Sequence, residues 1–201
     1  MSRTGIFGGT FNPIHIGHVE YARFVCEKLS LDRLLIIPAE VSPFKVNSGF
    51  CGVGDEDRLN MCCLAFNEPH MIVSDTELKR GGVSYSADTV DEIKRMYPDD
   101  ELFMFIGTDQ LMSFDRWQRY WDILKNATLV CVWRDVGCSK TDAHNFVEEK
   151  LAKYGNVIIL DFKPINISST EVRERIKNGQ SVKGLVPDVI NEYILKRGLY
   201  R

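Results

Sequence analysis

The chain has 201 residues, of which 44% are hydrophobic and 26% are charged, and its formal net charge is −3. This composition is typical of a globular protein, and the absence of a basic excess disfavours nucleic acid as a partner. No stretch approaches the roughly 20 apolar residues that span a bilayer, and no basic-then-apolar leader is visible, so we expect a cytoplasmic protein without a membrane partner.

The predicted elements alternate between short apolar runs and helical patterns. In chain order we expect a strand ending at Phe7, a helix at 17–29, a strand at 33–38, a loop at 39–54, a helix from 55 to the stop at Pro69, a strand at 70–75, a helix at 86–98, a strand at 102–107, a helix at 109–124, strands at 127–133 and 156–160, and short helices after Ser168 and Pro187. Continuous apolar strands that alternate with helices predict an α/β fold with a parallel sheet covered on both faces. The length suits one domain over residues 1–201.

The six cysteines include no C-x-x-C pair, which weakens a zinc or redox interpretation. Cys62 and Cys63 share helical spacing with Leu59 and Phe66, so both are predicted on a buried helix face. We expect six free thiols, none of them catalytic.

The stretch GIFGGTFNPIHIGH (5–18) follows the first strand directly. Its spacing is neither that of a dinucleotide-binding loop nor that of a P-loop. Gly8 and Gly9 allow the backbone to approach a ligand, and the N-terminus of the next helix suits phosphate. His15 and His18 can reach the same side of the turn and donate to phosphate oxygens. The alternative is a tight turn with a helix cap and two satisfied histidines.

The same stretch resembles the T/H-x-G-H signature of the nucleotidyltransferase superfamily, whose fold is Rossmann-like and doubly wound. The whole chain, from Gly5 to Arg201, is similar to the bacterial nicotinate-nucleotide adenylyltransferase family. The resemblance implies that ATP is bound by residues of the first motif, which are Gly8, Gly9, Thr10, Phe11, His15 and His18. It also implies that both histidines take part in catalysis.

A second motif, ISSTEVR (167–173), resembles the other superfamily signature. Ser168 and Glu171 also form a capping box, which explains those two residues without any ligand. Capping does not explain Arg173. The resemblance implies that Ser168, Ser169 and Arg173 hold the β- and γ-phosphates of ATP, with Arg173 as a third catalytic residue, since a guanidinium can bond two phosphate oxygens at once.

Two further segments resemble the family's mononucleotide site, which implies that Ser84, Tyr85, Ser86, Asp109 and Trp117 bind that substrate. Ser86 stands where the family usually has threonine, and Trp117 matches a tryptophan that stacks on the pyridine ring. An alternative for the first segment is a helix N-cap, and for Trp117 a place in the core.

The resemblance also points to Lys45 as a phosphate ligand, although Phe44 and Ser42 depart from the usual P-P-H-K. Arg134 is a weaker candidate for an ATP contact, because the segment WRDVG (133–137) departs from the R-P-G that the family often has.

The implied reaction joins nicotinate mononucleotide and ATP to give deamido-NAD and pyrophosphate, with Mg²⁺ on the phosphates. Alternatives are an adenylyltransferase for nicotinamide mononucleotide or phosphopantetheine, and a non-catalytic nucleotide sensor on the same fold. A class I tRNA synthetase also carries H-x-G-H, but 201 residues leave no space for a tRNA-binding domain. The oligomeric state stays open, with a homo-oligomer as one option.

Overall fold

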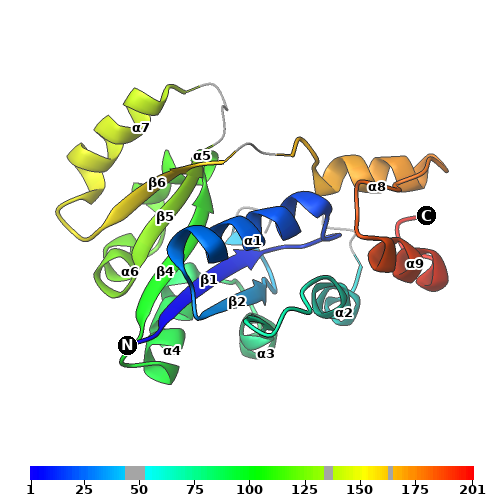
Figure 1. The fold of residues 1–201 in the computed structure, drawn as a ribbon, viewed down its shortest axis with the longest axis horizontal. Coiled ribbons are helices and arrows are strands. Elements are labelled where there is room, and N and C mark those ends of the chain that lie inside the picture. The colour runs from blue at the N-terminus through cyan, green and yellow to red at the C-terminus, as the bar shows by residue number, and fades with distance from the viewer. Residues whose placement is uncertain (44–52, 134–137, 163–164) are drawn as a thin grey trace.

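The computed structural model describes residues 1–43, 53–133, 138–162 and 165–201. Its six strands form one parallel sheet in the order β3-β2-β1-β4-β5-β6, as Figure 1 shows. The strands are β1 (Arg3–Gly9), β2 (Arg33–Pro38), β3 (Met71–Val73), β4 (Glu101–Gly107), β5 (Thr128–Trp133) and β6 (Val157–Asp161). The strand order reverses between β1 and β4, which is the doubly wound, Rossmann-like arrangement, so the expected fold class is confirmed.

The helical elements are α1 (Ile16–Leu29), α2 (Asp55–Ala65), α3 (Thr76–Arg80), α4 (Ser86–Met96), α5 (Thr108–Leu111), the 3₁₀ turn η2 (Phe114–Arg116), α6 (Tyr120–Asn126), α7 (Lys140–Phe146), the π-helical turn η3 (Val147–Leu151), α8 (Ser169–Lys177) and α9 (Asp188–Arg197). No helix within the described ranges is both long and apolar enough to cross a membrane.

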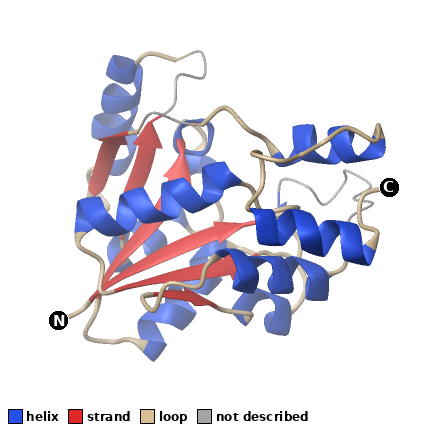
Figure 2. Cartoon of the chain, turned by 45° about the vertical axis from the view of Figure 1, so that its right-hand side comes forward, coloured by secondary structure: helices blue, strands red, loops and turns tan. Residues whose placement is uncertain are grey.

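Except on the edge strand β3, where Ile72 is exposed, alternate strand residues enter two separate cores, because successive side chains point to opposite faces of the sheet. On β1, Phe7 joins the core beneath α1, α2, α8 and α9, whereas Ile6 joins the core beneath α4, α5, α6 and α7. Figure 2 shows the strands fanning out between these two helical layers. Burial on both faces accounts for the continuous apolar runs in the sequence.

The prediction of a single continuous helix at 109–124 is wrong, because the structure divides this stretch into α5, η2 and α6. Arg119 adopts the left-handed conformation with φ of 55°, which a continuous helix does not allow. Its guanidinium is held there by the carboxylates of Asp88, Asp91 and Asp122. The pairs with Asp88 and Asp91 join Arg119 to α4, far away in the chain, and are not visible in the local pattern.

The elements α3, α7 and η3 were not predicted at all. A usable signal preceded α7, since Ser139 and Asp142 form a capping box in which the Asp142 N–H donates to the Ser139 hydroxyl at 3.1 Å. The helix expected to run to Pro69 ends at Ala65.

The two neighbouring cysteines of α2 do not share an environment. Cys62 is buried but Cys63 is exposed, so the prediction that both lie in the core is wrong for Cys63. The buried face of α2 instead runs through Arg58, Met61 and Ala65. The apolar spacing did not predict that an arginine, Arg58, is buried on this face.

Candidate active site

Two cavities meet at the carboxyl ends of β1 and β4, where the strand order reverses. The larger has a volume of about 450 Å³ and the smaller about 240 Å³. Six residues line both cavities, namely Gly8, Gly9, Phe105, Ile106, Asp109 and Gln110. This edge is where open α/β sheets bind ligands.

Gly8 and Gly9, at the end of β1, are needed for different structural reasons. Among the described residues, no atom lies within 4 Å of the point where a Cβ would stand on Gly8, and this glycine lines both cavities. A Cβ on Gly9 would come within 2.8 Å of the Phe11 ring. Gly8 therefore keeps space open for a ligand, whereas Gly9 allows the following loop to fold back.

His15 and His18 form a stacked pair at the start of α1. Their ring centroids lie 3.6 Å apart with an interplanar angle of 22°, and the His15 N–H donates to Nδ1 of His18 at 3.2 Å. Because Nδ1 accepts this hydrogen bond, the neutral His18 ring carries its proton on Nε2. His18 lines the smaller cavity and is therefore placed to donate there.

His15 lies behind His18, 7% exposed, and is not among the described residues that line either cavity. A Cβ on Gly17 would lie 3.0 Å from Nδ1 of His15, so this glycine makes room for the ring. The start of α1 is also less open than expected, because the N–H of Ile16 donates to the Leu185 carbonyl at 2.9 Å.

The second motif rests on the loop of the first motif. Ser169 Oγ donates to the Pro13 carbonyl at 2.8 Å, and Arg173 Nη1 donates to the Asn12 carbonyl at 2.7 Å. Ser168 caps α8 by accepting the N–H of Glu171 at 3.1 Å, as the capping box predicted. Among the residues that the structure describes as lining the two cavities, Ser168, Ser169 and Arg173 do not appear.

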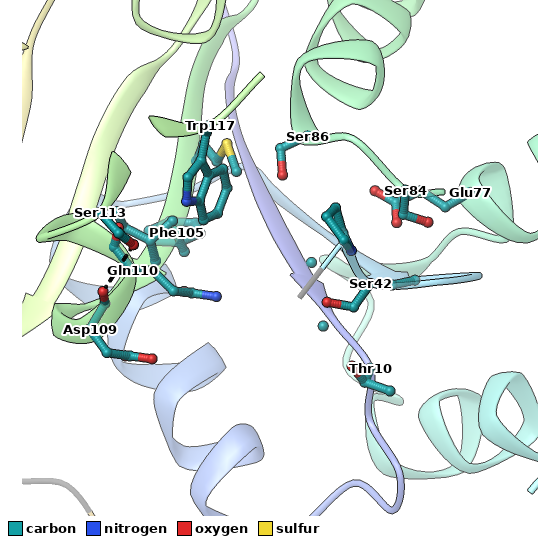
Figure 3. Close-up of a pocket in the computed structure, with 16 residues that line it drawn as sticks. Thr10, Ser42, Glu77, Ser84, Ser86, Phe105, Asp109, Gln110, Ser113 and Trp117 are labelled. Carbon is teal, nitrogen blue, oxygen red and sulfur yellow. Dashed lines mark hydrogen bonds between the residues drawn. The ribbon is translucent and has the colours of Figure 1, made fainter. Parts of the chain in front are cut away.

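The expected mononucleotide residues lie mostly around the larger cavity. Figure 3 shows Trp117 and Asp109 on one wall, with Ser84 and Ser86 on the other. Trp117 also packs on Phe114, with 5.1 Å between ring centroids, so it belongs partly to the core.

Three other expected residues are placed differently. Tyr85 is the N-cap of α4 and contributes its backbone there rather than a cavity wall. Lys45 and Arg134 lie outside the described residues.

The structure adds Gln110 to the junction of the two cavities. Its Oε1 accepts the N–H of Gly107 at 2.9 Å, which forces the NH₂ group to the other side of the amide. Figure 3 shows this nitrogen extending into the cavity. The sequence pattern did not distinguish Gln110, which follows Asp109, from an amide at the protein surface.

Arg58 is a second addition, and it joins the ends of β1 and β2. Its side chain is only 1% exposed, and Nη1 donates to the carbonyls of Thr10 at 3.0 Å and Ala39 at 2.6 Å. Asp55 balances its charge as an ion pair at the surface end. Arg58, which lies on α2, thus joins two segments that line the larger cavity.

A cytidylyltransferase-like family model matches residues 6–175. The chain is 39% identical over 201 residues to a probable nicotinate-nucleotide adenylyltransferase of Dehalococcoides mccartyi, covering 98% of this chain and 97% of that protein. It is also 39% identical over 195 residues to a probable enzyme of the same name from Hydrogenobaculum sp., covering 96% of each.

Among solved structures, Plasmodium falciparum nicotinic acid mononucleotide adenylyltransferase complexed with NaAD matches with a TM-score of 0.80 and 15% identity, over 100% of this chain and 98% of that chain. At this identity the match supports the fold alone, whereas the curated relatives span the full length at much higher identity. The chain therefore belongs to the cytidylyltransferase-like family and, within it, to the nicotinate-nucleotide adenylyltransferases.

Proposed function

We propose that this chain transfers the AMP part of ATP to nicotinate mononucleotide, giving deamido-NAD and pyrophosphate. A phosphate oxygen of the mononucleotide attacks the α-phosphorus of ATP, and the bond from that phosphorus to the bridging oxygen of the β-phosphate breaks. Pyrophosphate leaves with the bridging oxygen and its electron pair. The observation that carries the proposal is the pair of joined cavities, with His18 in one and Trp117 in the other.

The chemistry demands positioning rather than a protein nucleophile. A phosphate is already ionised near neutral pH, so no general base is required, and catalysis comes from alignment and from stabilising charge. Nε2–H of His18 suits the α-phosphate, where charge builds in the transition state. The amide NH₂ of Gln110 is a second donor at the junction, where the reacting phosphates would meet.

The residues present fit a Mg²⁺ ion that arrives on the substrate phosphates. Mg²⁺ usually keeps several waters and takes only one or two carboxylates from the protein. Asp109 is an exposed carboxylate that lines both cavities, and it would hold such an ion directly or through water. When bound, Mg²⁺ would neutralise part of the charge on the phosphates. Asp109 itself would keep the ion beside the junction.

Pyrophosphate release tests the proposal. ATP and Mg²⁺ are supplied with nicotinate mononucleotide, nicotinamide mononucleotide or phosphopantetheine in separate reactions. We expect release mainly with nicotinate mononucleotide. Release only with one of the other two would replace the substrate assignment, and no release with any of them would favour the nucleotide sensor.

A cytoplasmic location is a further part of the proposal, whereas the oligomeric state stays open, with a homo-oligomer as one option. Cysteines within the described ranges are free thiols, as is usual in a reducing compartment. Fractionation and light scattering test the two points separately.

A further inference from the structure

Glu77 is a carboxylate in the wall of the larger cavity. It lies on α3, is 6% exposed, and faces the cavity beside Ser84 (Figure 3). A buried carboxylate normally needs hydrogen-bond donors or a cation to offset the loss of water. Its surroundings supply both, from three different segments of the chain.

The first donor comes from α4. Thr89 Oγ1 donates to Oε1 of Glu77 at 2.6 Å, and the same Oγ1 accepts from Nη2 of Arg80 at 2.8 Å. The Tyr85 carbonyl is the other acceptor within reach of this hydroxyl, but at 3.4 Å it is much farther away, so the Thr89 proton is assigned to Glu77. Nη2 of Arg80 also lies 4.0 Å from the Glu77 carboxylate and balances part of its charge.

Ser84, which precedes α4, is a second polar neighbour of Glu77 in the wall of the larger cavity (Figure 3). Its Oγ accepts the N–H of Glu40 at 3.0 Å, and its side chain opposes the rise in the pKa of Glu77. The Ser84 N–H donates in turn to the Val41 carbonyl at 2.9 Å. Ser84 is therefore held by the loop after β2 through two hydrogen bonds, and it lies beside Glu77 in the same cavity wall.

Burial raises the pKa of Glu77, whereas the hydrogen bonds from Thr89 and Ser84 and the charge of Arg80 oppose that rise. They offset the effect of burial only in part, so the pKa of Glu77 stays raised. In its ionised form Glu77 can only accept hydrogen bonds, and the Thr89 hydroxyl then points its proton at it.

We propose that Glu77 is the positioning residue of the mononucleotide site, which fixes the wall formed by Ser84 and Ser86 before the substrate binds. This inference rests on the proposed function. Ser86 begins α4, whose first N–H groups have no acceptor within the helix and suit the carboxylate of a nicotinate ring. Glu77 acts on them by holding Ser84 and Thr89, on either side of this helix start, in one arrangement. The wall is thereby organised in advance for an anionic ring substituent.

Glu77→Gln tests the proposal with little change in volume. Its amide presents NH₂ where one carboxylate oxygen stood, toward Thr89 or toward Ser84, and this change of an acceptor into a donor disturbs the wall. We expect the Kd for nicotinate mononucleotide, measured by calorimetry without ATP, and the KM for it to rise by about tenfold or more. The KM for ATP should stay within about twofold of wild type, because ATP is expected in the other cavity.

Glu92→Gln is the matched control. Glu92 also bonds Arg80, at 3.0 Å, but it lies on the outer side of α4 and does not line the larger cavity as described. We expect the Glu92→Gln variant to keep the wild-type Kd and KM for nicotinate mononucleotide and the wild-type KM for ATP. Thr89→Val, combined with Glu77→Gln, should add little to the single effect, because both changes break the same network.

Equal increases in the KM for both substrates, or a lower melting temperature with an unchanged Kd, would overturn the positioning role. If Glu77→Gln fails to fold, Ser84→Ala must reproduce the selective rise in Kd, and a wild-type Kd there would overturn the proposal. Failure of the proposed function looks different. In that case the wild type binds nicotinate mononucleotide without releasing pyrophosphate, and the Kd comparison still decides the role of Glu77. A wild type that neither binds nor uses this mononucleotide would overturn both.

Discussion

Arg173 donates a hydrogen bond of 2.7 Å to the carbonyl of Asn12, across 161 positions of the chain. Nη2 of the same guanidinium bonds Thr170 at 3.0 Å, so the group is oriented by its own helix and by the first-motif loop. Tyr200 adds a hydrogen bond from its hydroxyl to the side chain of Asn12. Burial raises the pKa of Tyr200, so that its hydroxyl stays protonated as a donor throughout the neutral range. The loop that carries the histidines is thus held from outside by residues near the other end of the chain.

Arg173→Lys should lower kcat by about 10²-fold or more, because an ammonium cannot hold the Asn12 carbonyl and a phosphate with the same planar geometry. Steady-state kinetics with pyrophosphate detection measure the effect. Arg175→Lys is the control, since Arg175 lies on the same helix but pairs with the nearby Glu171 at 3.0 Å at the surface. Equal kinetics for the two variants would contradict a role for Arg173 in phosphate binding.

His18→Ala should lower turnover by about 10²–10³-fold while leaving the melting temperature nearly unchanged, because it removes a donor at the α-phosphate. His144→Ala provides the comparison, as this histidine is exposed on α7. A His18→Ala protein that melts normally and keeps near wild-type turnover would remove His18 from the mechanism.

Gly8→Ala should weaken both substrates with little change in stability. The added methyl group meets no described protein atom within 4 Å, but it enters space that both cavities share. We expect the KM for each substrate to rise several-fold or more, while thermal unfolding stays as in the wild type. Gly54→Ala, where an added Cβ likewise meets nothing described within 4 Å, should keep wild-type kinetics. Unchanged KM values in Gly8→Ala would mean that ligands do not approach this backbone.

Trp117→Ala should weaken nicotinate and nicotinamide mononucleotides by similar factors, because a stacked indole contacts either ring equally. The wild type should prefer the acid by about tenfold to a hundredfold in kcat/KM, since an amide NH₂ that faces the N–H groups at the start of α4 is mispaired at a cost of about 1–3 kcal/mol. Competition between the two mononucleotides gives both ratios. Trp121→Ala, at a residue that is 48% exposed, is the control. Equal use of the two substrates by the wild type would contradict recognition of the carboxylate by the N–H groups at the start of α4.

A thiol reagent should distinguish Cys63 from Cys62 in the folded protein. Cys63 is exposed, whereas Cys62 is buried in the core beneath α2. Burial also raises the pKa of Cys26 to about 12, which keeps that thiol protonated and unreactive near pH 8. Labelling followed by mass spectrometry should find modified Cys63 and unmodified Cys26 and Cys62 until the protein unfolds. Inactivation that ATP prevents, traced to one of these thiols, would contradict the expectation that none is catalytic.

Local patterns in the sequence predicted the elements that are repetitive or end at a strong signal. The strands of the sheet stood out as continuous apolar runs because both of their faces are buried. Helix α4 was recognised from its amphipathic spacing and the following Pro98. One failure, the single helix at 109–124, has a distant contact behind it, because Asp88 and Asp91 on α4 bind the side chain of Arg119, where the helix is interrupted.

The sequence by itself determined the fold class, the family and the glycine-histidine turn at the first strand, because these depend on periodicity and on short motifs. Only the tertiary structure decided which side chains work as partners. His18 and Gln110 are still oriented locally, because each accepts the backbone N–H of the residue three positions earlier, whereas the bonds of Arg173 to Asn12 and of Ser169 to Pro13 cross 161 and 156 positions. Glu77 becomes part of the substrate wall because α3, α4 and the loop after β2 converge on it. A hydrogen bond depends on distance and direction between atoms, and for residues far apart in the chain those are fixed by packing alone.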